Sequence, residues 1–173
     1  MRILQLHCDN ISYEPTKKEI QSAEDIDPKS VSIDEVVVCF VAVENGDNED
    51  VVMDAISQIK ESMQKIGCSK LLLYPYAHLS SDLSAPSTAL SLLKLMESQC
   101  SELEVSRAPF GWTKSYNVKV KGHPLAESSK VISAGAKKEK TSTALESESK
   151  IKSYLYIYSP DWKMEEFDKF NFS

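Results

Sequence analysis

The sequence lacks the short motifs by which many enzyme families are recognised. It contains no Gly-x-Ser-x-Gly nucleophile elbow, no His-Glu-x-x-His metal-binding helix, no phosphate-binding P-loop and no Gly-x-Gly-x-x-Gly dinucleotide fingerprint. Only 3 histidines are present, and each stands at the boundary of an expected element: His7, His78 and His123. Ligands collect at such boundaries in open α/β sheets, but a histidine there can equally cap a turn or bind a carbonyl group.

Long apolar runs are absent as well. No stretch approaches the roughly 18 residues that a membrane-spanning helix needs. The first ten residues, MRILQLHCDN, lack the apolar core and the small-residue cleavage site of a signal peptide. A chain of 173 residues with 42% hydrophobic and 27% charged residues has an ordinary globular composition. We therefore expect a cytoplasmic protein of one domain with appendages, and no contact with a membrane.

Metal-binding spacing is absent among the cysteines. Cys8, Cys39, Cys68 and Cys100 lie about thirty residues apart, with no Cys-x-x-Cys or Cys/His pair of metal-finger type. Cys39 lies inside an apolar run, where a thiol usually serves as packing material. The expectation is reduced, buried or half-buried cysteines, with no metal ion and no cofactor.

The sequence does contain strand-like and helical patterns in alternation. Residues 35–43 form a continuous β-branched run, which is typical of a strand covered on both faces. Residues 49–66 predict a helix, because apolar side chains recur at steps of three and four along one face, and Gly67 ends it. A second helix is expected to begin at Ser84–Pro86. The pattern predicts an α/β fold with crossover helices packed on a sheet.

Several further segments carry local predictions. Residues 14–34, which are polar and contain Pro15 and Pro28, indicate a long irregular excursion. Residues 104–110 and 115–120 predict an antiparallel strand pair around the turn 110–113, and residues 123–127 predict a short helix. Additional strands are expected over residues 2–7, 70–76 and 153–158.

Positive charge is gathered in one region of an acidic chain. The formal net charge of −6, taken alone, disfavours a nucleic-acid partner. Between residues 105 and 140, however, 8 basic residues, among them Lys119 and Lys121, stand against 2 acidic ones. This distribution permits a local phosphate-binding patch, and it is equally typical of a solvated, lysine-rich edge and linker.

Two clusters of residues suggest a binding site. Residues 74–81 carry a buried strand directly into a loop of small polar residues, and residues 108–114 combine glycine, two aromatic side chains and Lys114. Gly111 would allow a ligand or a backbone segment to approach closely. A purely structural interpretation makes both clusters turns around the core.

Four segments, in this order, closely resemble the N-terminal editing domain of archaeal threonyl-tRNA synthetase: MRILQLHCDNISYE, LYPYAHLSSDLSAPSTAL, RAPFGWTKSY and KGHPLAESS. The resemblance covers about residues 1–130, and its motifs are highly specific in combination. It implies the fold of the D-aminoacyl-tRNA deacylases, a mixed β-sheet with crossover helices packed on it. The tail KSYLYIYSPDWKMEEFDKFNF is also similar to the connector that leads into the catalytic domain of that synthetase.

The resemblance therefore predicts three parts: an editing domain over residues 1–132, a linker over 133–150 and a connector toward a synthetase catalytic domain over 151–173. The chain could be a portion of a longer enzyme, followed by catalytic and anticodon-binding domains, or a free-standing form. A homodimer is implied, with the acceptor end of tRNA(Thr) as the partner.

The reaction implied by the resemblance is hydrolysis of serine from tRNA that should carry threonine. Serine differs from threonine by one methyl group, which gives a binding pocket only about 1–3 kcal/mol of discrimination. A second site can exclude threonine because its pocket need only be too small for that methyl group. The nucleophile would be water, assisted by the 2′-hydroxyl of the substrate, with no covalent enzyme intermediate.

The resemblance also implies a set of site residues. Lys114, His78 and Glu127 would lie nearest the reacting ester, with Lys114 steadying the developing oxyanion. The basic residues Lys119 and Lys121 would face the tRNA. The substrate pocket would be formed by Val43, Pro75, Tyr76, Ala77, Phe110, Gly111, Trp112 and Thr113. Relatives are expected to carry an aromatic residue where this chain has Thr113, a difference that could alter rate or selectivity.

Three alternatives remain open at this level. One is a deacylase of the same fold that removes D-amino acids. Another is a module that binds tRNA without hydrolysing it. The last is an α/β interaction domain with no affinity for tRNA.

Overall fold

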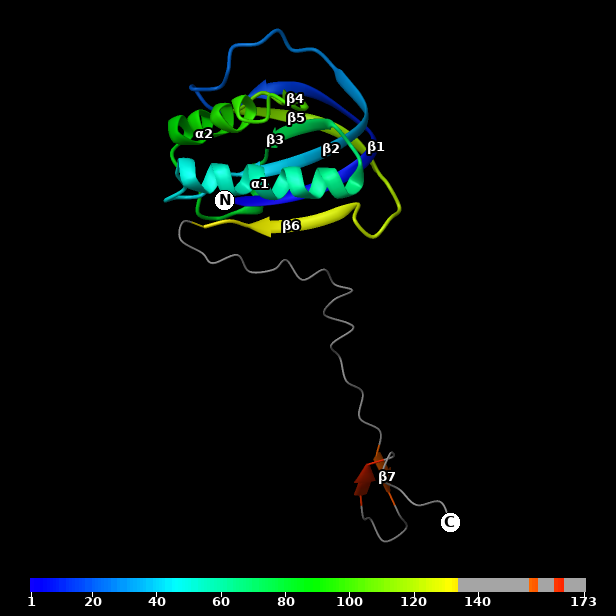
Figure 1. Ribbon diagram of the computed structural model, residues 1–173. Coiled ribbons are helices and arrows are strands. Elements are labelled where there is room, and N and C mark those ends of the chain that lie inside the picture. The colour runs from blue at the N-terminus through cyan, green and yellow to red at the C-terminus, as the bar shows by residue number, and fades with distance from the viewer. Residues whose placement is uncertain (134–155, 159–163, 167–173) are drawn as a thin grey trace. The chain divides into compact units, whose positions relative to one another are not determined.

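The computed structural model describes residues 1–133, 156–158 and 164–166 (Figure 1). The chain divides into two compact units, residues 1–139 and 140–173. In the second unit, β7 (Tyr156–Tyr158) pairs antiparallel with β8 (Met164–Glu166). The linker predicted over 133–150 and much of the predicted connector lie outside the described residues.

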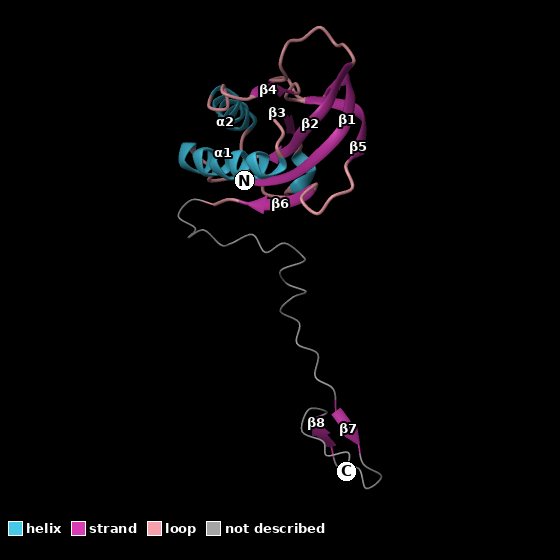
Figure 2. Ribbon diagram, turned by 45° about the vertical axis from the view of Figure 1, so that its right-hand side comes forward, coloured by secondary structure: helices cyan, strands magenta, loops and turns pink. Residues whose placement is uncertain are grey.

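The first unit is built on a six-stranded mixed sheet that curls around one side of the domain (Figure 2). Five strands follow the order β4-β3-β2-β1-β5, and β6 also pairs with β1. The parallel pairs are β2 with β3 and β3 with β4, whereas β1 is antiparallel to each of its partners. The strands are β1 (Arg2–Lys18), β2 (Val31–Ala42), β3 (Lys70–Pro75), β4 (Glu104–Arg107), β5 (Trp112–Val120) and β6 (Glu127–Val131).

The first strand organises this sheet. Over its first part β1 lies between β2 and β6, and over its second part it lies between β2 and β5. Its pairing with β2 ends at Tyr13, so Pro15, which has no N–H group to donate, is paired only with β5. The pairing register shifts between Pro15 and Lys17. A strand of 17 residues can therefore pass through a proline.

Both α-helices lie on the same face of the sheet (Figure 1). The helix α1 (Glu49–Ile66) coincides with the range predicted from its apolar spacing, and α2 (Pro86–Ser98) begins at the predicted proline. The Asn48 side chain caps α1 by accepting a hydrogen bond from the N–H of Val51, and Gly67 ends the helix in the left-handed conformation. The buried faces of these helices pack on a core that includes Val37, Cys39 and Leu71.

The other face of the sheet encloses a second hydrophobic cluster, rich in aromatic rings. Tyr74 packs edge-on against Tyr13 at 5.7 Å between ring centroids and lies 5.0 Å from Phe40. The short 3₁₀ helix η1 (Ala77–Leu79) follows β3, and Leu79 packs against this cluster. Residues 74–79 therefore pack on a second hydrophobic core, on the face of the sheet opposite the two helices.

Several local predictions are wrong. The first strand extends to Lys18 and β2 begins at Val31, so the irregular excursion is shorter than the predicted range 14–34. The segment 123–126 forms a turn, and β6 begins at Glu127 where a helix was expected. Pairing with Arg2–Leu6 accounts for this strand, because the long β1 offers a free edge there.

The predicted antiparallel pair over 104–110 and 115–120 is also wrong. The strand β4 pairs in parallel with β3, and β5 pairs with β1. Their nearness in sequence suggested a hairpin, but each strand finds a longer partner elsewhere in the sheet. The turn between them is thereby free to line a cavity.

The predicted burial of the cysteines is confirmed. All four thiols are free; Cys8, Cys39 and Cys100 are buried, and Cys68 is half-buried. Burial raises the pKa of the Cys8 thiol to about 11 and that of Cys39 to about 12. The thiols of Cys8 and Cys39 therefore stay protonated at neutral pH and contribute to the packing of the core. Within the described residues, no helix is long and apolar enough to cross a membrane.

Candidate functional site

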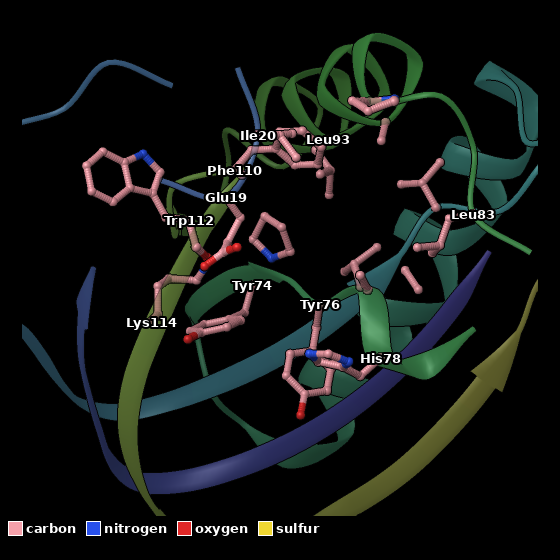
Figure 3. Close-up of a pocket in the computed structure, with 18 of the residues that line it drawn as sticks. Glu19, Ile20, Tyr74, Tyr76, His78, Leu83, Leu93, Phe110, Trp112 and Lys114 are labelled. Atoms are coloured by element: carbon pink, nitrogen blue, oxygen red, sulfur yellow. The ribbon is translucent and has the colours of Figure 1, made fainter. Parts of the chain in front are cut away.

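A cavity of about 350 Å³ opens where the parallel strands β2 and β3 end (Figure 3). The carboxyl ends of neighbouring parallel strands are a common place for ligands in α/β sheets. The two clusters singled out in the sequence meet here, since residues 74–78 and 110–114 line the same cavity. All eight residues predicted for the substrate pocket are in its wall: Val43, Pro75, Tyr76, Ala77, Phe110, Gly111, Trp112 and Thr113.

Lys114 brings a half-buried amine to this cavity. Its Nζ donates hydrogen bonds of 2.9 Å to the carbonyl oxygens of Pro109 and Trp112 and lies 5.0 Å from the ring centroid of Tyr74. Burial lowers the pKa of Lys114 to about 8. The amine is therefore protonated at neutral pH and loses its proton under mildly alkaline conditions.

His78 stands on η1, at another part of the cavity wall. Its ring packs edge-on against Tyr76, with 5.3 Å between centroids. In the view of Figure 3, Lys114 and His78 lie on opposite sides of the cavity, with Tyr74 and Tyr76 between them. A ligand that touches both polar groups would have to lie across these rings.

Glu127 is not among the residues that line the cavity. It is exposed at the start of β6, directly opposite Leu6 of β1. Cross-strand partners share a face of the sheet, and Leu6 belongs to the cluster against which Tyr76 and Leu79 pack. Glu127 thus lies on the same face of the sheet as η1, and its assignment to the reacting ester stays a prediction.

The two lysines predicted to face tRNA lie on and just beyond the end of β5, away from the cavity wall. Lys119 forms an ion pair of 3.1 Å with Asp9. Lys121 contacts Asp9 at 2.6 Å and Glu35 at 2.7 Å, and these carboxylates hold its pKa above the usual range. The protein's own acids therefore partly neutralise this basic region.

The other two histidines lie outside the cavity wall. The Nδ1 of His7 lies 2.8 Å from the Nε2 of His123, so one ring donates a hydrogen bond to the other. Burial, and then the charge of His123, lowers the pKa of His7. This pair joins β1 to the turn before β6, which supports the structural interpretation of both side chains.

The sequence did not indicate that residues 19–24, hereafter the strap, lie beside the cavity. Glu19 and Ile20 of the strap are in the wall. The N–H of Glu19 donates to the carbonyl of Gly111 at 2.9 Å, and the N–H of Glu24 donates to that of Phe110 at 3.2 Å. The strap is thus hydrogen-bonded along the turn 110–112.

Gly111 makes this close approach possible. Its φ is +79°, and a Cβ atom placed there would lie 2.7 Å from the Cα of Ala23 in the strap. From the sequence, Gly111 was expected to allow a ligand or a backbone segment to approach closely. In the structure the strap is the segment that does so. Nothing in the polar sequence of residues 19–24 indicates where they pack.

The comparisons with known proteins agree with this geometry. The family model described as the archaea-specific editing domain of threonyl-tRNA synthetase matches residues 1–132. This chain belongs to that family. The family resemblance found in the sequence is therefore confirmed, and the matched range contains every residue that lines the cavity.

Similar full-length proteins are threonine–tRNA ligases. The ligase of Nitrosopumilus maritimus is 62% identical over 178 residues, and that of Cenarchaeum symbiosum is 51% identical over 173 residues. A ligase of Thermococcus kodakarensis is 39% identical over 183 residues. The alignments cover 100% of this chain but only 28–29% of the ligases. The chain therefore spans less than a third of the length of these curated relatives.

A solved structure shares the fold of this editing domain. The c-Myc DNA Unwinding Element Binding Protein superposes with a TM-score of 0.58, covering 78% of this chain and 100% of its own. At 8% sequence identity the likeness concerns the mixed sheet and its two helices alone.

Proposed function

We propose that this editing domain hydrolyses the ester of L-seryl-tRNA(Thr) and spares L-threonyl-tRNA(Thr). The observation that carries the proposal is the convergence of the two clusters, residues 74–78 and 110–114, on one cavity, with the Lys114 amine at its wall. An editing site has to hold an aminoacyl ester and the terminal adenosine, and a cavity with apolar walls and aromatic rings suits both groups.

Exclusion of threonine is the selective step of the proposed reaction. The wall is built from Val43, Pro75 and Ala77 at the carboxyl ends of two central strands. Such strand ends are held by the surrounding core and cannot easily move to admit an additional methyl group. A site that attaches threonine must be large enough for its methyl group and therefore also admits serine. A rigid pocket that is too small for this methyl group can admit serine and exclude threonine.

The geometry of Lys114 fits stabilisation of an oxyanion. An ammonium group has three N–H donors, and two of them are used by the carbonyls of Pro109 and Trp112. One donor remains for the carbonyl oxygen of the ester as it acquires negative charge during attack by water. Because the amine is already fixed, little reorganisation accompanies this step.

The serine and threonine hydroxyl groups in the wall are poorly suited to act as nucleophiles. Thr113 Oγ1 donates to Glu19 at 2.8 Å, and Ser84 Oγ lies 3.4 Å from the carbonyl of Ala85. Within the described residues, the Ser84 hydroxyl forms no hydrogen bond with a histidine or a carboxylate that could take its proton. This supports the proposed use of water with assistance from the 2′-hydroxyl of the substrate.

The relatives support one further proposal. Because the similar ligases are more than three times as long as the matched region, we infer that catalytic and anticodon-binding domains follow in a longer cytoplasmic enzyme. The homodimer expected from the resemblance, and the fold relationship to D-aminoacyl-tRNA deacylases, stay predictions. Light scattering on the purified chain would check the dimer.

The deciding experiment follows ester loss from L-seryl-, L-threonyl- and D-aminoacyl-tRNA(Thr). The proposal predicts rapid loss of L-serine only, and a rate for Lys114→Met that is lower by about a hundredfold, as expected for loss of an oxyanion donor. Lys65→Met, on the exposed side of α1, is the matched control and should leave the rate unchanged.

The other outcomes distinguish the alternatives. Loss of the D-amino acid alone would identify the D-aminoacyl-tRNA deacylase. Survival of all three esters at the uncatalysed rate, with tRNA still bound, would identify a non-catalytic binding module.

A further inference from the structure

The strap contains one residue, Glu24, whose side chain and backbone together contact both ends of the turn 110–112. The Glu24 carboxylate accepts a hydrogen bond of 2.8 Å from the N–H of Phe110. Its main-chain carbonyl accepts another, also of 2.8 Å, from Nε1 of Trp112. Glu24 therefore holds the turn from its side chain and from its backbone at once.

The same turn supplies the two oxygens that hold the amine of Lys114. These are the carbonyls of Pro109, directly before Phe110, and of Trp112. Movement of the Phe110 N–H or of the Trp112 ring would displace one of these two acceptors. The N–H of Phe110 belongs to the same peptide group as the Pro109 carbonyl, and the Trp112 ring belongs to the residue that supplies the other acceptor of Lys114.

A buried guanidinium fixes the position of Glu24. Arg107 donates to both carboxylate oxygens, at 2.6 and 2.8 Å, and also to Glu97 near the end of α2 at 2.8 Å. Its side chain is only 10% exposed. A bidentate pair of this kind holds a planar carboxylate in one orientation. The strap is therefore tied to β4 and α2 as well as to the turn.

We propose that Glu24 is a positioning residue for the editing reaction, which acts by holding the turn 110–112 so that the Lys114 amine faces the substrate. The proposal rests on the proposed function for its effect on catalysis. Its structural part, the fixing of the Lys114 amine by the strap, is independent of the substrate.

Electrostatics supports the same link. The Glu24 carboxylate raises the pKa of Lys114 against the larger effect of burial, which lowers it to about 8. Removing the negative charge leaves burial unopposed, so the protonated fraction of Lys114 at neutral pH falls. The titration of this amine therefore reports its nearness to the Glu24 carboxylate, and the deacylation rate tests the positioning.

The first test is a titration of the Lys114 side chain by NMR in protein labelled at the lysine side-chain carbons, with the signal assigned by its loss in Lys114→Met. Glu24→Gln is expected to lower the pKa of Lys114, by an amount on the order of half a unit. The control is Asp25→Asn, which removes the next acid along the chain, an exposed carboxylate in an ion pair with Lys18. An unchanged Lys114 titration in Glu24→Gln overturns the proposal.

The second test is a double-mutant cycle on seryl-tRNA deacylation by the full chain. Glu24→Gln is expected to lower the rate at least about tenfold in the parent protein, because misplaced catalytic groups cost this much or more. It should have little further effect in the Lys114→Met background, because the two residues act as a unit. Equal losses in both backgrounds, or no loss in the parent, would overturn the proposal.

A third variant covers the case in which Glu24→Gln fails to fold. Glu24→Asp keeps the charge beside Arg107 but is too short to contact Phe110 as well, so it should fold and still lower the rate. Normal activity in Glu24→Asp would contradict the positioning role. If the parent protein hydrolyses no seryl-tRNA, the proposed function fails, whereas the NMR titration still tests the link between the Glu24 carboxylate and the Lys114 amine.

Discussion

Lys114 illustrates how burial changes the chemistry of a single side chain. A lysine in water keeps its charge up to about pH 10. Here the half-buried amine has a pKa of about 8 and is held by two carbonyl oxygens. A cation that is costly to keep in this position is typical of a functional group, because a purely structural role would favour an exposed lysine or an ion pair.

This pKa leads to a prediction about pH. Lys114 is protonated below about 8, so its stabilisation of an oxyanion is fully present at neutral pH and is lost as the pH rises through that value. The measurement is the ratio of deacylation rates between the parent protein and Lys114→Met across that range. The ratio removes the direct effect of hydroxide on the ester, and we expect it to fall on the alkaline side.

Lys114→Arg is the companion variant. A guanidinium stays charged throughout this range, so any activity that remains should lose the alkaline decline. If the ratio for the parent protein instead rose with pH, Lys114 would be acting as a neutral base and not as a cation.

The sequence predicted many of the site residues and missed one side of the cavity. Lys114, Tyr76 and Phe110 could be found because they stand in short clusters where aromatic, glycine and basic residues interrupt a strand pattern. Glu19 and Glu24 stand in an acidic, polar stretch that resembles any surface loop. Their role comes only from tertiary contacts, and no local pattern encodes the partner of such a contact.

At the scale of elements, the strap and the turn 110–112 form one unit. The two segments share main-chain hydrogen bonds, and Gly111 packs directly on Ala23. A side chain at position 111 would therefore have to push the strap away from the cavity. The stability of the strap and the shape of the site depend on the same contact.

Gly111→Ala tests this contact. The left-handed backbone conformation costs a non-glycine residue about 1 kcal/mol, and the overlap with Ala23 adds to this, for a loss of about 3 kcal/mol in the free energy of unfolding. Gly67→Ala is the matched control, because Gly67 has a φ of +75° with no atom within 4 Å of the added Cβ. Chemical denaturation measures both, and equal losses would contradict close packing at Gly111.

The elements themselves were predictable where a pattern is local. The apolar face of α1 and its capping residues define the helix completely, and the β-branched run defines most of β2. The short strands β4 and β6 have few apolar residues, so the identity of their partners decides their structure. That information is distributed along the whole chain, which explains why a hairpin and a helix were wrongly expected there.

At the scale of the whole molecule, charge is arranged in compensating pairs. The chain carries a net charge of −6, and Lys17, Lys18 and Lys119 each have a carboxylate within ion-pair distance. Exposed pairs of this kind contribute little stability and can exchange their partner for a phosphate. We therefore expect tRNA phosphates to bind first to the lysines whose ion pairs with the protein's own carboxylates are weakest.

Lys119 is more easily released than Lys121, because its side chain is 76% exposed and has one carboxylate partner where Lys121 has two. If the basic region faces tRNA, Lys119→Ala should weaken binding and reduce the slope of log affinity against log salt by about 1, whereas Lys121→Ala should reduce it less. Filter binding at several salt concentrations measures the slope, with Lys65→Ala as control. Unchanged slopes in both variants would place the tRNA elsewhere.

The central position of β1 has a consequence for how the protein forms during translation. Arg2 pairs with both Ala42 and Val131, so β1 gains its last neighbour only after some 130 further residues have been made. Until then the nascent chain carries an open strand edge of the kind that promotes aggregation. Slow codons or chaperone binding before β6 is synthesised would therefore act on the most vulnerable state of the whole domain.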